Sequence, residues 1–209
     1  MGFQTKTPAR GGKHRVNHDV LSPNNAWHIP LERDGLTLRE ALRQMHQSGD
    51  WQEDIPLLVQ LVENPRFQPP GLSLFHGAVD LYAHDCIHLI LGRGMMPKDE
   101  AFVIGFTMGS TNRVSTMEEK LYTFIAGNIY PGSYRFSEDD VQIFRDGLHL
   151  GMLSRCQPLD TIDWHSLERQ TLRTARQHIN LEVGLLLAYY AEEKTRYPDA
   201  VESQRLRER

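Results

Sequence analysis

The chain has 209 residues, of which 40% are hydrophobic and 24% charged, a composition typical of a folded globular protein rather than a disordered one. The formal net charge of −4 gives no indication of a nucleic-acid partner, and two cysteines, Cys86 and Cys156, are too few for a disulfide framework or a thiolate metal site. The sequence contains no run of eighteen apolar residues and no apolar segment typical of a secretory signal, so we expect a cytoplasmic protein.

Residues 1–30 contain many Gly, Pro, Asn and basic residues without hydrophobic periodicity, so we expect a flexible basic arm. Its positive charge would suit contact with an anionic membrane surface. From Thr37 onward helix-start signals recur, typically a Ser or Thr followed three positions later by an acidic residue. The expected helices span residues 38–47, 50–62, 74–91, 97–112, 115–130, 137–155, 161–178 and 181–194.

The residues beyond 196 are densely charged with both signs, and we expect a solvated tail over residues 197–209. Between the arm and this tail we find no internal repeat and no second domain boundary. The sequence therefore predicts an all-α protein in which residues 31–196 form a single metal-binding domain, a bundle of about seven or eight helices.

The expected helix at 74–91 is unusual because apolar residues cover most of its circumference. A helix of this composition should be buried nearly all round. One stripe of it nevertheless carries the ionisable residues Asp80, His84, Asp85 and His88. Burying imidazoles and a carboxylate without partners would cost several kcal/mol, and a dication removes that cost by supplying the opposite charge.

The spacing of these residues indicates a metal site. His84 and His88 are one helical turn apart and project from one face, and Asp85 lies about 100° round from His84. A glycine-containing turn at 92–96 then places Glu100 in the first turn of the next helix, where its carboxylate can point back. We predict a divalent metal held by all four residues. The donors suit zinc, iron, manganese or cobalt, with magnesium as a further alternative, and they suit calcium poorly.

The motif His84-Asp85-Cys86-Ile87-His88, followed after eleven residues by Glu100, resembles the HDxxH-x11-E signature of the fourth coenzyme Q (ubiquinone) biosynthesis protein family. The run from 163 to 180, which contains Trp164 and Arg173, is similar to the carboxy-terminal helix of that family. The resemblance extends over roughly residues 35–185 and is strongest at 82–112.

This resemblance implies an all-helical fold, a divalent metal usually assigned as zinc, and a place in ubiquinone biosynthesis. It further implies action on a polyprenylated benzoate-type ring, with oxidative loss of the ring carboxyl group and hydroxylation at that carbon. The protein would then be a metal-dependent decarboxylase, a lyase, that binds a quinone precursor or another isoprenoid lipid. Members of the family also organise other quinone-biosynthesis enzymes, which implies peripheral contact with the inner face of a bacterial membrane. A homodimer is compatible with these features.

Within this interpretation Asp85 is the candidate catalytic residue, for proton transfer. Gly105 and Gly109 lie four residues apart on the helix that follows the glutamate ligand. We regard them as candidate substrate-binding positions, because two missing side chains could leave room for an isoprenoid tail. The same spacing also suits close packing between two helices.

Two other functions remain open. A non-catalytic scaffold that binds lipid or quinone would use the same metal structurally. A metal-dependent hydrolase would use the acid between the two histidines as a general base, and an HD-type phosphohydrolase would also recruit His76 and Asp146. Turnover of a prenylated substrate would distinguish the decarboxylase function from the scaffold function.

Overall fold

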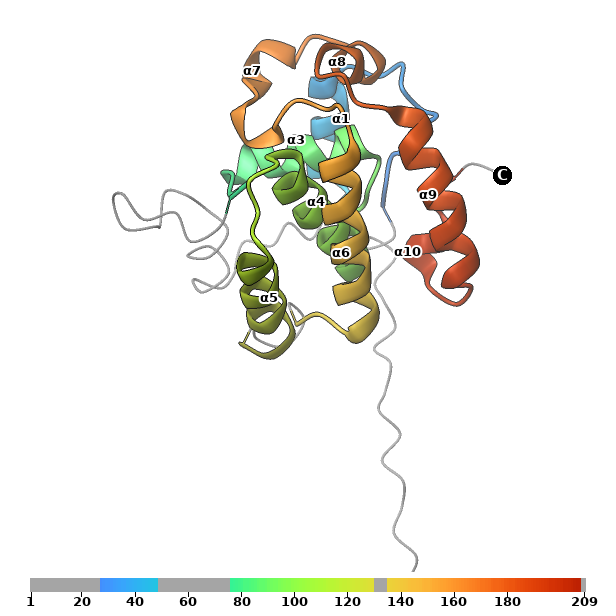
Figure 1. Ribbon diagram of the computed structural model, residues 1–209. Coiled ribbons are helices and arrows are strands. Elements are labelled where there is room, and N and C mark those ends of the chain that lie inside the picture. The colour runs from blue at the N-terminus through green and yellow to red at the C-terminus, as the bar shows by residue number, and fades with distance from the viewer. Residues whose placement is uncertain (1–26, 49–75, 130–134, 208–209) are drawn as a thin grey trace, which may run out of the picture.

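A computed structural model describes residues 27–48, 76–129 and 135–207 (Figure 1). Within these ranges the chain is helical and forms no strand, which confirms the expected all-α class. The α-helices are α1 (Leu38–Gln47), α3 (Leu81–Leu91), α4 (Pro97–Ser110), α5 (Thr116–Phe124), α6 (Glu138–Leu153), α7 (Trp164–Leu167), α8 (Leu172–His178), α9 (Val183–Arg196) and α10 (Val201–Gln204). A π-helical turn (Ile125–Ile129) continues α5, and a 3-10 turn (Leu159–Thr161) precedes α7.

Helix starts follow the local sequence signals. In α1, α5 and α6 the N-cap hydroxyl accepts a hydrogen bond from a backbone N–H of the first turn, and an acidic side chain accepts one from the N-cap backbone. The three pairs are Thr37 with Glu40, Ser115 with Glu118, and Ser137 with Asp140. Pro97 opens α4, at a position where its missing N–H has no helical partner to lose. The sequence near each start is therefore enough to set these four boundaries.

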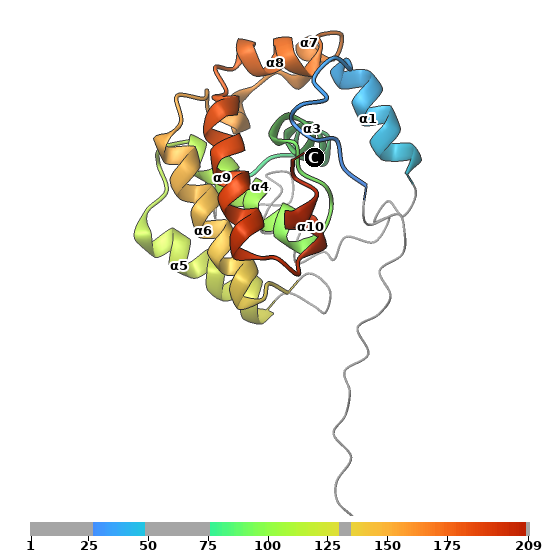
Figure 2. The same ribbon diagram turned by 90° about the vertical axis from the view of Figure 1, so that its right-hand side faces the viewer.

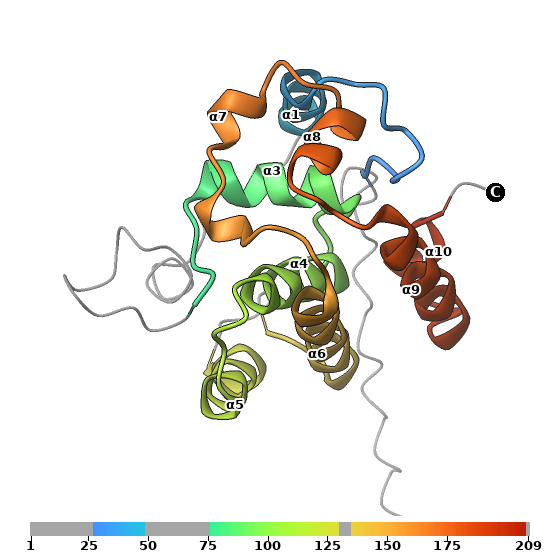
Figure 3. The same cartoon turned by 45° about the horizontal axis from the view of Figure 1, so that its top comes forward.

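The helices form two groups on either side of α3. Figure 3 shows α1, α7 and α8 on one side of α3, and α4, α5 and α6 on the other. α9 and α10 pack together at one end of these groups, as Figure 2 shows. The apolar core includes Ile87 and Leu89 of α3 together with Phe102 and Phe106 of α4, all fully buried. The C-terminal half of α3 thus lies inside the molecule, with helices around it.

Helices α4 and α6 pack with their backbones in contact. Glycines line both sides of this interface: Gly105 and Gly109 on α4, and Gly147 and Gly151 on α6. A Cβ at Gly147 would lie only 2.7 Å from the carbonyl oxygen of Phe102, and a Cβ at any of the other three would meet a backbone carbonyl oxygen still more closely. The pair can approach this closely only because these side chains are absent.

Helix α3 begins later than the sequence predicted. We expected a helix from residue 74, but residues 49–75 lie outside the described ranges and α3 begins at Leu81. Gly77 has a φ of 84°, and a Cβ there would lie 2.8 Å from the Cα of Met108 in α4. Asp80 is the N-cap of α3 rather than part of its polar stripe, since its side chain accepts a hydrogen bond from the backbone N–H of Ala83.

Three further boundaries differ from the expectations. The helix expected over 161–178 is two helices, because Thr171 caps a new helix start. The tail expected to be solvated from 197 onward contains α10 and packs on the domain, with Leu206 fully buried. At the other end, Ile29 of the expected arm is buried as well. Residues 1–26 of the arm and the helix expected at 50–62 lie outside the described residues.

Candidate metal centre

Three of the predicted ligands converge on one point. α3 presents His84 and His88 one turn apart, and the first turn of α4 presents Glu100. Nε2 of His84 lies 2.9 Å from Nε2 of His88 and 3.0 Å from Oε2 of Glu100. Nε2 of His88 lies 3.3 Å from the same oxygen. In the part of the chain that the structure describes, these three residues form a group that could hold a metal ion.

The spacing of these atoms suits a small transition-metal dication. Zinc binds imidazole nitrogen and carboxylate oxygen at about 2.0–2.2 Å, which places neighbouring tetrahedral ligand atoms about 3.3 Å apart. Calcium prefers an all-oxygen shell, whereas two of these three atoms are nitrogens. Imidazole nitrogens that face each other at 2.9 Å cannot both direct lone pairs into the gap unless a proton or a cation lies there. The donor set therefore fits a divalent transition metal without selecting one of them.

His88 is held in the tautomer that a metal ligand needs. Its ring is fully buried, and its Nδ1 lies 2.6 Å from the backbone carbonyl oxygen of Gly94. Because a carbonyl oxygen can only accept, Nδ1 carries the proton and the Nε2 lone pair is available to a metal. The side chains of His84 and Glu100 are 20% and 28% exposed, so the cluster is accessible from their side.

The charges of the cluster stabilise one another. Burial lowers the pKa of His88, but the Glu100 carboxylate beside it outweighs this effect and the net shift is upward. Burial likewise raises the pKa of Glu100, but the two histidines hold that pKa well below its usual range. Without a metal the cluster favours an ionised carboxylate beside a protonated imidazole, so a metal ion would displace a proton as it binds.

Two side chains from distant parts of the sequence fix the end of α3 that carries the second histidine. The buried Arg176 of α8 donates hydrogen bonds to the backbone carbonyls of Leu89 at 3.1 Å and Ile90 at 2.9 Å. Tyr190 of α9 donates its hydroxyl to the carbonyl of Leu91 at 2.6 Å. The last carbonyls of a helix have no N–H four residues later to bind, although Leu89 also accepts a hydrogen bond from the N–H of Gly92 at 3.3 Å. A positive charge at a helix C-terminus is favourable. The sequence analysis missed both residues, because no local pattern connects them with α3.

Asp85 lies outside the group of three. Its Oδ2 is 3.6 Å from Nε2 of His46 on α1, and its Oδ1 is buried without a hydrogen-bond partner. Burial raises the pKa of Asp85 to about 7, and the positive charge of His84 partly opposes that shift. The 100° rotation per residue along α3 accounts for this placement, because it turns Asp85 from the cluster toward α1. The structure therefore brings together three of the four predicted ligands.

The two glycines chosen as substrate-binding positions face another helix. A Cβ at Gly105 would lie 3.0 Å from the backbone N of Leu148, and one at Gly109 would lie 3.1 Å from the Cα of Gly151. The expected room for an isoprenoid tail on this side of α4 is therefore filled by α6. The glycine spacing instead serves close packing between α4 and α6, which was the alternative interpretation of these two positions.

The residues that an HD-type phosphohydrolase would recruit also lie elsewhere. The ring of His76 lies 3.1 Å from the carboxylate of Glu118 at the start of α5. Asp146 of α6 accepts hydrogen bonds from Tyr189 and Arg196 of α9, at 3.1 and 2.6 Å. Each thus has a structural partner outside the three-residue cluster, and the arrangement needed for that alternative is not formed.

Comparisons with protein families, with curated proteins and with solved structures find no match for this chain. Within the described ranges, none of the helices has the length and apolar character needed to cross a bilayer.

Proposed function

We propose that this protein is a metal-dependent enzyme that binds one divalent ion, zinc in the first instance, through His84, His88 and Glu100. The observation that carries the proposal is the convergence of two imidazole nitrogens and one carboxylate oxygen within 3.3 Å of one another. Three protein ligands would leave a fourth position for water or substrate, as in catalytic rather than structural zinc sites. The partial exposure of His84 and Glu100 gives a substrate access to that position.

We further propose a prenylated aromatic acid as the substrate, because the motif resembles that of the ubiquinone-biosynthesis family. A bound metal would act as a Lewis acid toward the carboxylate or phenolate of the ring. The ring would lose its carboxyl group as carbon dioxide and gain a hydroxyl from water at that carbon, with release of two protons and transfer of two electrons to an external oxidant. Asp85 lies outside the three ligands but interacts electrostatically with His84 and Glu100, and its pKa of about 7 would let it both take and give a proton near neutral pH. Such a lipid substrate would bring the protein to a membrane surface.

Metal binding is tested first, with purified protein stripped by a chelator and reloaded with zinc or cobalt. We expect about one ion per chain in the parent and a loss of binding in His88→Ala. The exposed His149 of α6 provides the control, because His149→Ala also removes one imidazole and should keep the ion. Since a proton competes for the buried His88, whose pKa is raised, the metal should be released as the pH falls below neutral. Unchanged metal content in a folded His88→Ala variant would refute the assignment.

Turnover is tested next with the metal-loaded protein and two substrates, a polyprenylated hydroxybenzoate and the same ring without its tail. Mass spectrometry should detect carboxyl loss and ring hydroxylation for the prenylated compound in the presence of an oxidant, and Asp85→Asn should slow that reaction without removing the metal. Binding of the prenylated compound without turnover would favour the scaffold function. Equal turnover of the prenylated ring and the ring without its tail would remove the support for a quinone precursor as the substrate.

A further inference from the structure

The turn between α3 and α4 supports the metal centre directly. Its residue Gly94 supplies the carbonyl oxygen that accepts the Nδ1 hydrogen of His88 at 2.6 Å. At the end of the turn the backbone N–H of Met96 donates to Oδ2 of Asp99 at 3.1 Å. Asp99 directly precedes the ligand Glu100 and is completely buried. The positions of two of the three ligands therefore depend on how this turn is held.

The C-terminal segment of the chain holds this turn from the outside. The guanidinium of Arg205 forms an ion pair with Oδ2 of the buried Asp99. The same group occupies the space beside Gly94, where a Cβ would lie 2.9 Å from Cζ of Arg205. Arg205 thus contacts the turn at both of the positions that support the ligands.

Further contacts fix the segment that carries Arg205. Leu206 is fully buried, and Ser203 of α10 donates its hydroxyl to Oε1 of Glu193 at 2.9 Å. Glu193 in turn forms a two-bond ion pair with Arg93, at 3.0 and 2.5 Å, and Arg93 belongs to the same turn. Figure 2 shows α10 beside α9 and close to α4. The segment is consequently part of the wall around the turn.

We propose that Arg205 is a positioning residue of the metal centre and that the C-terminal segment is needed for full metal affinity. This inference rests on the proposed metal binding. With Arg205 removed, the nearest remaining cation is Arg93, whose Nη1 is 3.8 Å from Oδ1 of Asp99, and a void opens beside Gly94. The turn can then relax, which moves the carbonyl that orients His88 and the backbone that carries Glu100. Groups that orient metal ligands in this way typically change metal affinity by about 10–100-fold.

The test measures the affinity of the full-length protein for cobalt, by competition with a chromophoric chelator, and records the visible absorption of the bound cobalt. Arg205→Ala should lower the affinity at least tenfold and alter the absorption spectrum, because the ligand geometry changes. Arg205→Lys keeps a positive charge beside Asp99 but not the planar contact with Gly94, so its cobalt affinity should lie between those of the parent and Arg205→Ala. The control is Arg207→Ala, since Arg207 is 44% exposed and its ion pair with Glu32 is a long surface contact of 4.0 Å.

Circular dichroism of the metal-free variants establishes that each is folded at the temperature of the measurement. A folded Arg205→Ala variant with the affinity and spectrum of the parent would overturn the inference and leave the proposed function intact. If Arg205→Ala does not fold, a folded Arg205→Lys variant with parental affinity would overturn it instead. A parent protein that binds no cobalt would refute the proposed metal binding, and this inference with it.

Discussion

Helix α4 takes part in two interfaces of opposite character. Against α6 its backbone packs directly on the backbone of the other helix, because Gly105 and Gly109 have no side chains to separate the two. Against α3 its first turn contributes a carboxylate, which meets two imidazoles. The first interface needs nothing beyond the chain itself, whereas the second brings together groups whose charges a metal ion would complete. A firmly packed helix can therefore also present a carboxylate to a group of side chains that could hold a metal ion.

The comparison also explains how the polar interface keeps its geometry. Charged and polar groups near the cluster are held by long-range contacts, such as those of Arg176 with the end of α3. On the other side, α4 cannot shift along α6, because its glycines fit against fixed backbone atoms. The ligands thus project from two supports that are fixed independently of the metal, which favours a preformed site over one that the metal must assemble.

The largest expected effect comes from removing the cation at the end of α3. Arg176→Met removes the guanidinium donor from the backbone carbonyls of Leu31, Leu89 and Ile90, of which Leu89 keeps a hydrogen bond from the N–H of Gly92 at 3.3 Å. We expect the free energy of unfolding, measured by urea denaturation, to fall by on the order of 4 kcal/mol. The matched control is Arg173→Met on the same helix, which should lower the free energy of unfolding far less, because solvent screens that charge. Arg173 is 67% exposed and pairs with Asp34 at the surface. Equal losses in the two variants would show that the buried cap is not what stabilises α3.

The α4–α6 interface should respond to a single methyl group. In Gly109→Ala the added Cβ meets the backbone of Leu148, so the helices must separate, and we expect a loss of about 3 kcal/mol in the free energy of unfolding. Gly184 of α9 offers the comparison, because a Cβ there has no neighbour within 4 Å. Gly184→Ala should leave stability unchanged or raise it by up to about 1 kcal/mol, since alanine favours the helix. Similar values for both variants would contradict the close packing.

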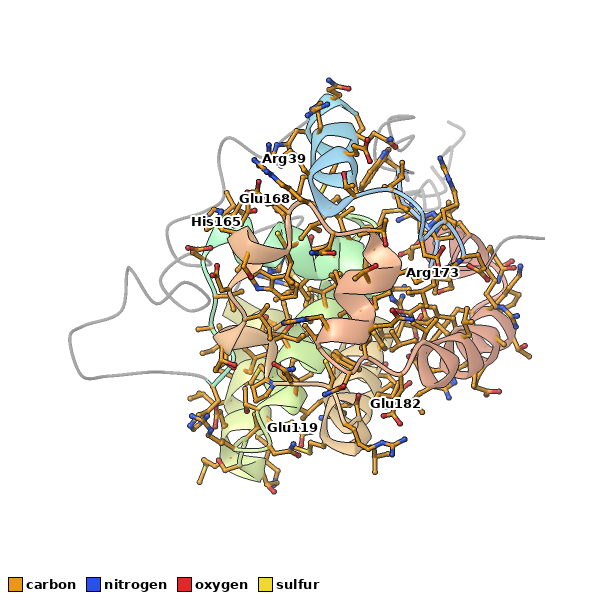
Figure 4. All side chains as sticks on the ribbon, turned by 90° about the horizontal axis from the view of Figure 1, so that it is seen from above. Arg39, Glu119, His165, Glu168, Arg173 and Glu182 are labelled. Carbon is orange, nitrogen blue, oxygen red and sulfur yellow. The ribbon has the colours of Figure 1, made fainter. Side chains whose placement is uncertain are left out.

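The smallest expected effect concerns an exposed ion-pair cluster at the junction of α1, α3 and α7. Glu168 accepts hydrogen bonds from Tyr82 at 2.6 Å and from Arg39, and His165 lies beside it (Figure 4). The hydrogen bond from Tyr82, followed by that from Arg39, lowers the pKa of Glu168 to about 2. A lowered carboxyl pKa stabilises the fold above the ordinary glutamate value of 4.5, and this contribution is lost as the pH falls toward 2.

Glu168→Gln should therefore cost no more than about 1 kcal/mol at pH 7, because the group is solvent-screened. The difference from the parent should shrink as the pH falls below about 4, when measured by urea denaturation at each pH. Glu192→Gln serves as the control, since Glu192 is 62% exposed and its nearest cation lies 3.7 Å away. A difference that grows on acidification would contradict the direction of the pKa shift.

The sequence alone predicts a structural feature correctly where the residues that determine it are close together in the chain. The capping pairs set the helix starts, and the four-residue spacing of His84 and His88 put two ligands on one face. The predicted start of α3 was wrong because a contact with a residue distant in sequence determines it: Gly77 packs against α4, and α3 begins only after it. Asp85 was assigned to the cluster from its angle about the helix, about 100° from His84, but its side chain lies toward His46 of α1. Rotation along a helix can be calculated from sequence, whereas the identity of the helix opposite cannot.

The carbonyl contacts of Arg176 and Tyr190 have a consequence for the order in which this protein matures. All ligands of the cluster lie within a stretch of seventeen residues, from 84 to 100, but Arg176 and Tyr190 follow the α3 carbonyls that they bind, those of Ile90 and Leu91, by 86 and 99 positions. During synthesis the ligands would emerge long before their supports, and a partly made chain would hold a metal only loosely. Firm metal binding would then mark a chain that has been synthesised and folded at least as far as α9.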